Sequence, residues 1–349
     1  LDAVGSAFTG LTPAEIYLAP ALPETIFTRA ASHVDRPIAI LPDVSWFRLP
    51  IVARFLAAGL DRTFAANDAA ATDAALEHLR AARADRETVM AWIHYYAPHD
   101  PYRVRSAFPF GAGKKNAYLS EVATFDRELG RLLDYLREDG WLEDTLVVFF
   151  SDHGEALGEQ GYWGHHVYLN GWMTDVPLVL WHDDLDPARP DVGASLADVA
   201  PTVLHFLGLP GPPDIAAQSL FTLDADLQDR PTFAEAFPVR GRELFDELLL
   251  PSLDDATIRE RLRSIREASK GYEPKGSVTV DGYRLVHHRS ADTMLLYARG
   301  WRGEETRAHD PGTETSLRAE LARWEQEQLQ RIECRLRLNV DPTEPPRPR

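Results

Sequence analysis

The sequence predicts an α/β protein in which helices sandwich a mostly parallel, mixed sheet, with a smaller C-terminal α+β lobe. Short apolar runs alternate with helix-length segments, and because these runs show no regular polar alternation they are typical of strands buried on both faces. The 349 residues suffice for one large domain and one smaller one. From about residue 238 the pattern changes to charged helical segments and a hairpin. We therefore expect domains at 1–237 and 238–340 and a Pro-rich disordered tail at 341–349.

The expected elements of the large domain alternate along the chain. Its strands are short, apolar runs at residues 37–41, 89–96, 145–150, 177–181 and 232–236. Its helices are amphipathic or apolar segments at residues 51–60, 70–84, 117–138 and 198–207. The smaller lobe is expected to contain a helical stretch at 240–270, two strands at 277–280 and 283–288 around an Asp-Gly turn, and a final helix at 315–333.

The composition excludes several classes of protein. A net charge of −17 argues against a nucleic acid partner, because affinity for a phosphate backbone depends on clusters of Lys and Arg. No apolar run approaches the roughly 20 residues that span a bilayer, so no membrane segment is expected in this chain. Cys334 is the only cysteine, which excludes an intrachain disulfide and thiolate zinc sites. The chain begins at Leu1 without a signal sequence, as expected for a processed protein or a fragment, and its compartment and oligomeric state stay open.

The strongest chemical signal is the run from Ser151 to Glu155, directly after the expected strand 145–150. In open α/β sheets, ligands bind at the carboxyl edge of the strands. Asp152 and His153 could therefore both bind one divalent cation, if Gly154 lets the backbone turn at once. The alternative is an aspartate that caps the next helix beside a surface histidine.

Two loops carry further histidines. His165 and His166 lie in a glycine-rich loop before the strand 177–181, where His165 could donate to a substrate anion or complete a metal shell; the alternative is that both are merely solvated. His99 lies between two prolines after the strand 89–96, so its imidazole would be held with little entropy to lose. It is a candidate general acid for a departing alkoxide. His94, inside the strand, is expected to pack in the core.

Several of these blocks occur in an order that is specific when taken together. They are residues 6–13, 94–102, 144–155, 163–166 with 176–180, and 198–204. In this order they resemble the sulfatase family of the alkaline phosphatase superfamily, over residues 1 to about 330. The resemblance implies an alkaline-phosphatase-like fold and a hydrolase that acts on sulfate esters or related phosphate esters through a covalent intermediate.

The resemblance also implies roles for four side chains. Asp152 and His153 would bind one divalent metal ion, Ca²⁺ or Mn²⁺ by preference, with Mg²⁺ and Zn²⁺ as alternatives. His99 would protonate the leaving group, and His165 would contact the sulfuryl or phosphoryl oxygens. The substrate would be a small anionic ester.

The sequence departs from the family pattern near its start. By the resemblance, the nucleophile would lie immediately before Leu1 and two acidic metal ligands further upstream, so the chain alone is expected to be inactive. Formylglycine sulfatases are expected to have Pro and Arg where Asp2 and Val4 stand, which favours a Thr or Ser nucleophile. The alternatives are a phosphodiesterase or phospho-alcohol transferase, as in the soluble domain of a membrane enzyme, and a catalytically inactive binding domain.

Overall fold

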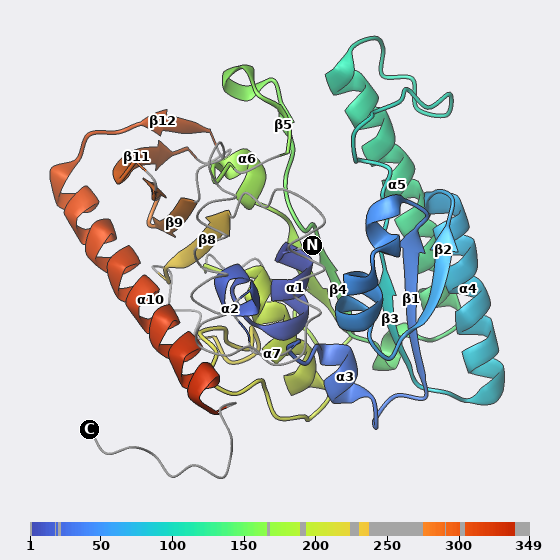
Figure 1. The fold of residues 1–349 in the computed structure, drawn as a ribbon. Coiled ribbons are helices and arrows are strands. Elements are labelled where there is room, and N and C mark those ends of the chain that lie inside the picture. The colour runs from blue at the N-terminus through green and yellow to red at the C-terminus, as the bar shows by residue number, and fades with distance from the viewer. Residues whose placement is uncertain are drawn as a thin grey trace.

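The computed structural model of the chain describes most of its residues (Figure 1). They are residues 2–17, 19, 22–165, 168–188, 193–223, 230–236, 275–289, 291–300 and 304–338. His166, the expected helical stretch 240–270 and the expected tail 341–349 lie outside the described residues. Within the described part, none of the helices combines the length and the apolar character that a membrane span requires.

A three-stranded parallel sheet in the order β2-β1-β3 forms the centre of the first lobe. Its strands are β1 (Arg36–Pro42), β2 (Asp61–Ala65) and β3 (Val89–Ile93). The expected strands at 37–41 and 89–96 are confirmed, whereas β2 was missed because its first two residues are charged and exposed. Because β1 and β3 are parallel neighbours, their carboxyl ends meet at the same edge.

Alternate residues of β1 enter two different apolar clusters, which explains the absence of polar alternation. Ile38 and Ile40 pack with the helices α4 (Asp68–Asp85) and α5 (Lys114–Glu138). Ala39 and Leu41 face the other way, into the larger cluster. The sheet is therefore sandwiched by helices, as the sequence predicts.

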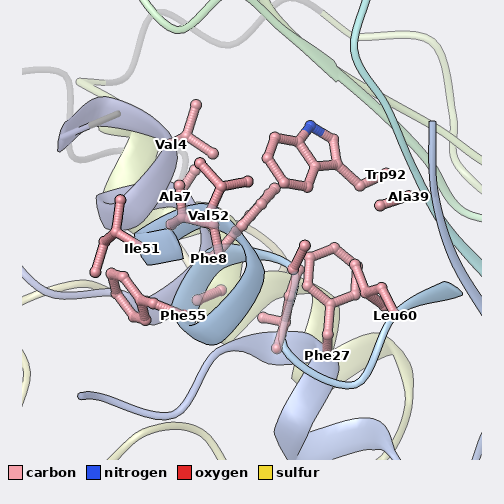
Figure 2. Close-up of a cluster of buried hydrophobic side chains, with 14 of the residues drawn as sticks. Val4, Ala7, Phe8, Phe27, Ala39, Ile51, Val52, Phe55, Leu60 and Trp92 are labelled. Atoms are coloured by element: carbon pink, nitrogen blue, oxygen red, sulfur yellow. The ribbon is translucent and has the colours of Figure 1, made fainter. Parts of the chain in front are cut away.

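The larger cluster is built from the amino-terminal helices and from α7 (Val199–Phe206). Phe8, on α1 (Asp2–Thr9), contacts the rings of Phe27 and Trp92 edge to face, at 4.9 Å between centroids in each pair (Figure 2). The remaining helical elements of this region are α2 (Pro13–Tyr17), α3 (Ile26–Ala30), the π-helical turn Val52–Leu56 and the 3₁₀ turns Ser45–Arg48 and Leu196–Asp198. The expected helix at 51–60 is thus only one π-helical turn.

The segment that carries the candidate site consists of short elements. Strands β4 (Val147–Phe150) and β7 (Leu178–Trp181) pair antiparallel, with Val147 opposite Trp181, which gives the mixed character expected of the lobe. Between them lie β5 (Ala156–Leu157), β6 (Trp163–Gly164) and α6 (Gly171–Thr174). Two 3₁₀ turns complete the region, at Leu142–Asp144 and Glu159–Gly161.

The second lobe is a five-stranded antiparallel sheet in the order β12-β11-β10-β9-β8. Its strands are β8 (Thr232–Ala236), β9 (Lys275–Val280), β10 (Tyr283–His288), β11 (Thr293–Arg299) and β12 (Glu305–Arg307). The helix α10 (Pro311–Leu338) packs against it. Figure 1 shows this helix in red beside the sheet.

The assignment of residues 232–236 to the main sheet was wrong. This segment is β8, which pairs with β9 in the second sheet, with Thr232 opposite Thr279. The physical reason is that Phe233 stacks on Trp324 of α10, at 4.6 Å between ring centroids, and so packs against the apolar cluster of the second lobe. The second sheet therefore begins before the boundary expected at 238.

Candidate functional site

The chain leaves β4 through a segment that is pressed against α6. The amide of Gly154 donates a hydrogen bond to the carbonyl of Met173 at 2.8 Å. A Cβ atom at Gly154 would lie 1.9 Å from the carbonyl oxygen of Trp172, a distance that no side chain tolerates. Glycine is therefore required here by close backbone approach, and this approach fixes where the preceding Asp152 and His153 lie.

Asp152 and His153 form a compact pair. The backbone amide of His153 donates to Asp152 Oδ1 at 3.1 Å, and its Nδ1 donates to the carbonyl of Gly154 at 2.9 Å. The other ring nitrogen, Nε2, then lies 3.8 Å from Asp152 Oδ2. Burial raises the pKa of the Asp152 carboxyl, but the imidazole of His153 and the hydrogen bond from the His153 amide help to lower it, and the pKa lies below its usual value. The carboxylate is thus ionised at neutral pH.

This pair fits part of a metal coordination shell. Metal–ligand distances are about 2.0–2.6 Å, so two donor atoms separated by 3.8 Å can contact one ion. Carboxylate and imidazole donors suit Mn²⁺, Zn²⁺ and similar ions. Across the described ranges, no group of three His, Cys, Asp or Glu side chains is arranged to hold an ion. Further ligands would therefore have to come from other groups, and the assignment of this pair as ligands stays a prediction.

Three imidazoles from three different segments form a row beside this pair. The ring of His153 lies 4.3 Å from the ring of His165, between centroids, and the ring of His165 lies 4.8 Å from that of His99. His165 follows β6, and His99 lies in the loop after β3. The structure thus brings together all four side chains that the sequence singles out for chemistry.

His99 is held by its own loop. Its ring stacks on Tyr96, with 4.3 Å between centroids and 16° between planes, and its Nδ1 donates to the carbonyl of Asp100 at 2.6 Å. Nε2 is then the ring nitrogen available to a substrate oxygen. Burial lowers the pKa of His99, so its protonated form is a stronger acid than free imidazolium.

His165 is paired with the carboxylate of Glu155, a residue for which the sequence predicts no role. Its Nδ1 lies 3.2 Å from Oε2 of Glu155, whose side chain is only 7% exposed. The hydrogen bond that this carboxylate accepts from the imidazole raises the pKa of His165. The same carboxylate and the burial of the phenol raise the pKa of Tyr102, with burial the larger cause. Glu155 lies in the run that carries Asp152, so its position beside two assigned residues was the available signal.

His94 packs in the core, as expected. Its ring lies 4.6 Å from that of Phe47 and 6.0 Å from that of Trp92, between centroids. Burial lowers the pKa of His94 to about 4, so it is neutral at physiological pH. It borders the site through its electrostatic interaction with Asp152.

The pairing of Glu155 with His165 leads to a prediction about pH. In Glu155→Gln the pKa of His165 should fall, because the carboxylate that raises it is lost while the burial that lowers it remains. In the wild type, the pair stabilises the fold below the ordinary pKa of histidine, and this stabilisation is lost as the pH rises through the raised pKa. The variant should lack that pH dependence. NMR titration of the imidazole protons and thermal unfolding below and above neutral pH measure the two effects.

Glu159→Gln is the matched control for this prediction. Glu159 lies exposed in the 3₁₀ turn between β5 and β6, and its side chain accepts a hydrogen bond from the amide of Leu157 at 2.5 Å. An equal change in the titration of His165 in both variants would contradict the assigned pairing.

Known proteins are similar in sequence to the part of the chain that carries the candidate site. Residues 46–209 match the family model described as Sulfatase, a range that includes all four residues of the site. The choline-sulfatase of Rhizobium meliloti is 34% identical over 95 residues, which are 27% of this chain and 18% of that protein. The N-acetylglucosamine-6-O-sulfatase of Bacteroides thetaiotaomicron is 36% identical over 105 residues, which are 30% of this chain and 19% of that protein.

The structural similarity to known proteins covers more of the chain than these sequence matches do. The phosphonate monoester hydrolase of Silicibacter pomeroyi superposes with a TM-score of 0.63 at 16% identity, over 96% of this chain and 86% of that one. The curated relatives are matched over about a fifth of their length. These findings show that residues 46–209 match the sulfatase family model and that the chain has an alkaline-phosphatase-like fold.

Proposed function

We propose that this protein hydrolyses small anionic sulfate esters or related phosphate esters, with one divalent ion bound by Asp152 and His153. The observation that carries the proposal is the row of three imidazoles next to an ionised carboxylate. A chain of net charge −17 repels anions unless positive charge is concentrated where they bind. The row and the ion would supply that charge.

The four side chains of the site would have different roles in the reaction. The bound ion would polarise the ester oxygens and neutralise charge on them. His165, with Nδ1 turned to Glu155, can donate from Nε2 to a non-bridging oxygen of the ester. His99 can deliver the proton on Nε2 to the departing alkoxide, for which its lowered pKa suits it. By the family resemblance, we also propose a nucleophile immediately upstream of Leu1 and a covalent intermediate formed on it.

Sulfate and phosphate esters are both supported as substrates. The sulfatase match favours a sulfate ester, whereas Asp2 and Val4 favour a Thr or Ser nucleophile and hence a phosphate ester. A hydrolase of phosphonate monoesters also shares the fold. The gathering of all four side chains favours an enzyme over an inactive binding domain, since a binding domain has no need to retain them together.

The test uses the intact protein, with whatever sequence precedes Leu1, and two chromogenic substrates, an aryl sulfate and an aryl phosphodiester. We expect turnover of at least one, its loss on treatment with a chelator, and its recovery with Mn²⁺ or Ca²⁺. Calorimetric titration with the same ions gives an independent measure of binding. Turnover that survives complete removal of metal would overturn the metal assignment, and failure to bind either ion or cleave either ester would favour the inactive binding domain.

A further inference from the structure

One guanidinium group of the second lobe holds both ends of α6. Arg284, on β10, has a side chain that is only 3% exposed. Its Nη1 donates to the carbonyl of Leu169, just before α6, at 3.0 Å, and its Nη2 donates to Oδ1 of Asp175, just after α6, at 2.7 Å. A helix of four residues cannot hold its own shape in isolation. The position of α6 therefore depends on this contact.

Further charges complete the cluster around Arg284. Oε1 of Glu305, whose side chain is fully buried, lies 3.0 Å from Arg284 Nη1, and its Oε2 accepts a hydrogen bond from Asn170 at 3.1 Å. Arg299 forms a second ion pair with Asp175. The positive charges of the two guanidinium groups equal the negative charges of the two carboxylates, so the cluster has no net charge. Planar guanidinium groups suit such multiple contacts, which an ammonium group could not make at once.

The helix α6 also contacts the segment that carries the candidate site. The carbonyl of Met173 accepts the hydrogen bond of the Gly154 amide, and the carbonyl of Trp172 leaves room there only for a glycine. The carbonyl of Gly154 in turn binds Nδ1 of His153 at 2.9 Å and so orients its ring. A continuous set of hydrogen bonds thus runs from Arg284 through α6 to His153.

We infer that Arg284 is a positioning residue for the site, which it acts on by fixing α6 and, through α6, the backbone that carries Asp152 and His153. The inference rests on the proposed function, because orienting Asp152 and His153 affects metal binding only if these residues bind a metal. The effect of Arg284 on the position of Gly154 does not depend on any catalytic activity. It predicts that removing the guanidinium loosens Gly154, although the two residues have no contact with each other.

Arg289 offers a matched control within the same sheet. It directly follows β10 and, like Arg284, joins two carboxylates, Glu235 at 3.0 Å and Glu325 at 2.9 Å. These partners lie on β8 and α10. Arg289→Met therefore removes a comparable ion cluster of the second lobe and leaves the contacts of α6 in place.

The experiment compares Arg284→Met, Arg289→Met and the wild type of the intact protein by amide hydrogen exchange at Gly154. We expect exchange at Gly154 to quicken about tenfold or more in Arg284→Met beyond any change in Arg289→Met, because the acceptor on Met173 is no longer held. Mn²⁺ affinity should fall about tenfold in the same variant alone, as for the loss of groups that orient metal ligands. Equal exchange at Gly154 in both variants would overturn the inference.

A milder variant guards against a loss of folding in Arg284→Met. Asp175→Asn removes one charge from a side chain that is 31% exposed, and it should quicken exchange at Gly154 in the same direction. Exchange at Gly154 that stays at the wild-type rate in this folded variant would also contradict the inference. Hydrogen exchange requires no turnover, so a protein that binds no metal and cleaves no ester would refute the proposed function while the exchange data still decide the role of Arg284.

Discussion

Asp152→Ala is expected to lower the turnover of the ester substrate by about 10²–10³-fold or more in the intact protein. The variant loses the ionised carboxylate that lies 3.8 Å from His153 Nε2, and one lost electrostatic contact at a reacting centre commonly has an effect of this size. Affinity for Mn²⁺ should fall together with the turnover. Steady-state kinetics and calorimetric titration measure the two effects on the same preparation.

Asp144→Ala is the control for this substitution. Asp144 lies exposed in the 3₁₀ turn before β4, so the two aspartates stand at opposite ends of the same strand. Its removal should leave both turnover and metal affinity unchanged. Equal activity of Asp152→Ala and wild type would rule out Asp152 as part of the catalytic site.

Gly154→Ala is expected to destabilise the protein by about 3 kcal/mol or more and to abolish activity. The new methyl group would stand 1.9 Å from the carbonyl oxygen of Trp172 and 2.8 Å from its carbonyl carbon, and neither backbone atom can rotate away as a side chain could. Either α6 or the segment with Asp152 and His153 must move. Thermal unfolding gives the loss of stability, and a Mn²⁺ titration reports the damage to the site.

Gly130→Ala provides the opposite result under the same assay. Gly130 lies within α5, and a Cβ atom there has no neighbour within 4 Å. Alanine favours helix over glycine by about 0.5–1 kcal/mol, so this variant should be slightly more stable and fully active. A Gly154→Ala protein as stable as wild type would show that α6 does not press on the site.

Sequence patterns predict the first lobe well where burial alone decides the structure. The run 37–41 has no polar alternation, and the strand β1 indeed sends Ile38 and Leu41 into two different apolar clusters. They miss β2, and they find β8 but assign it to the wrong sheet. The first begins with charged residues, and the second is too short for its partner sheet to be identified from its own residues.

The proximity of the four candidate site residues could be predicted, because they follow strands and lie beside Gly or Pro. What could not be predicted is which groups support them. Glu155 contacts His165 across ten positions in the sequence, and Arg284 contacts Leu169 across 115. No periodicity or motif links such pairs, because tertiary packing alone brings them together.

The contact between Arg284 and the ends of α6 also has a consequence for how the protein forms. All four site residues lie between positions 99 and 165, so they leave the ribosome well before β10. The first lobe can fold around β1 in the meantime, since its contacts are closer in sequence, whereas α6 gains its anchor only when the second sheet is complete. We therefore expect the site to become ordered only after the second sheet has formed, and a chain that stops before residue 284 would contain all four site residues but lack the anchor of α6.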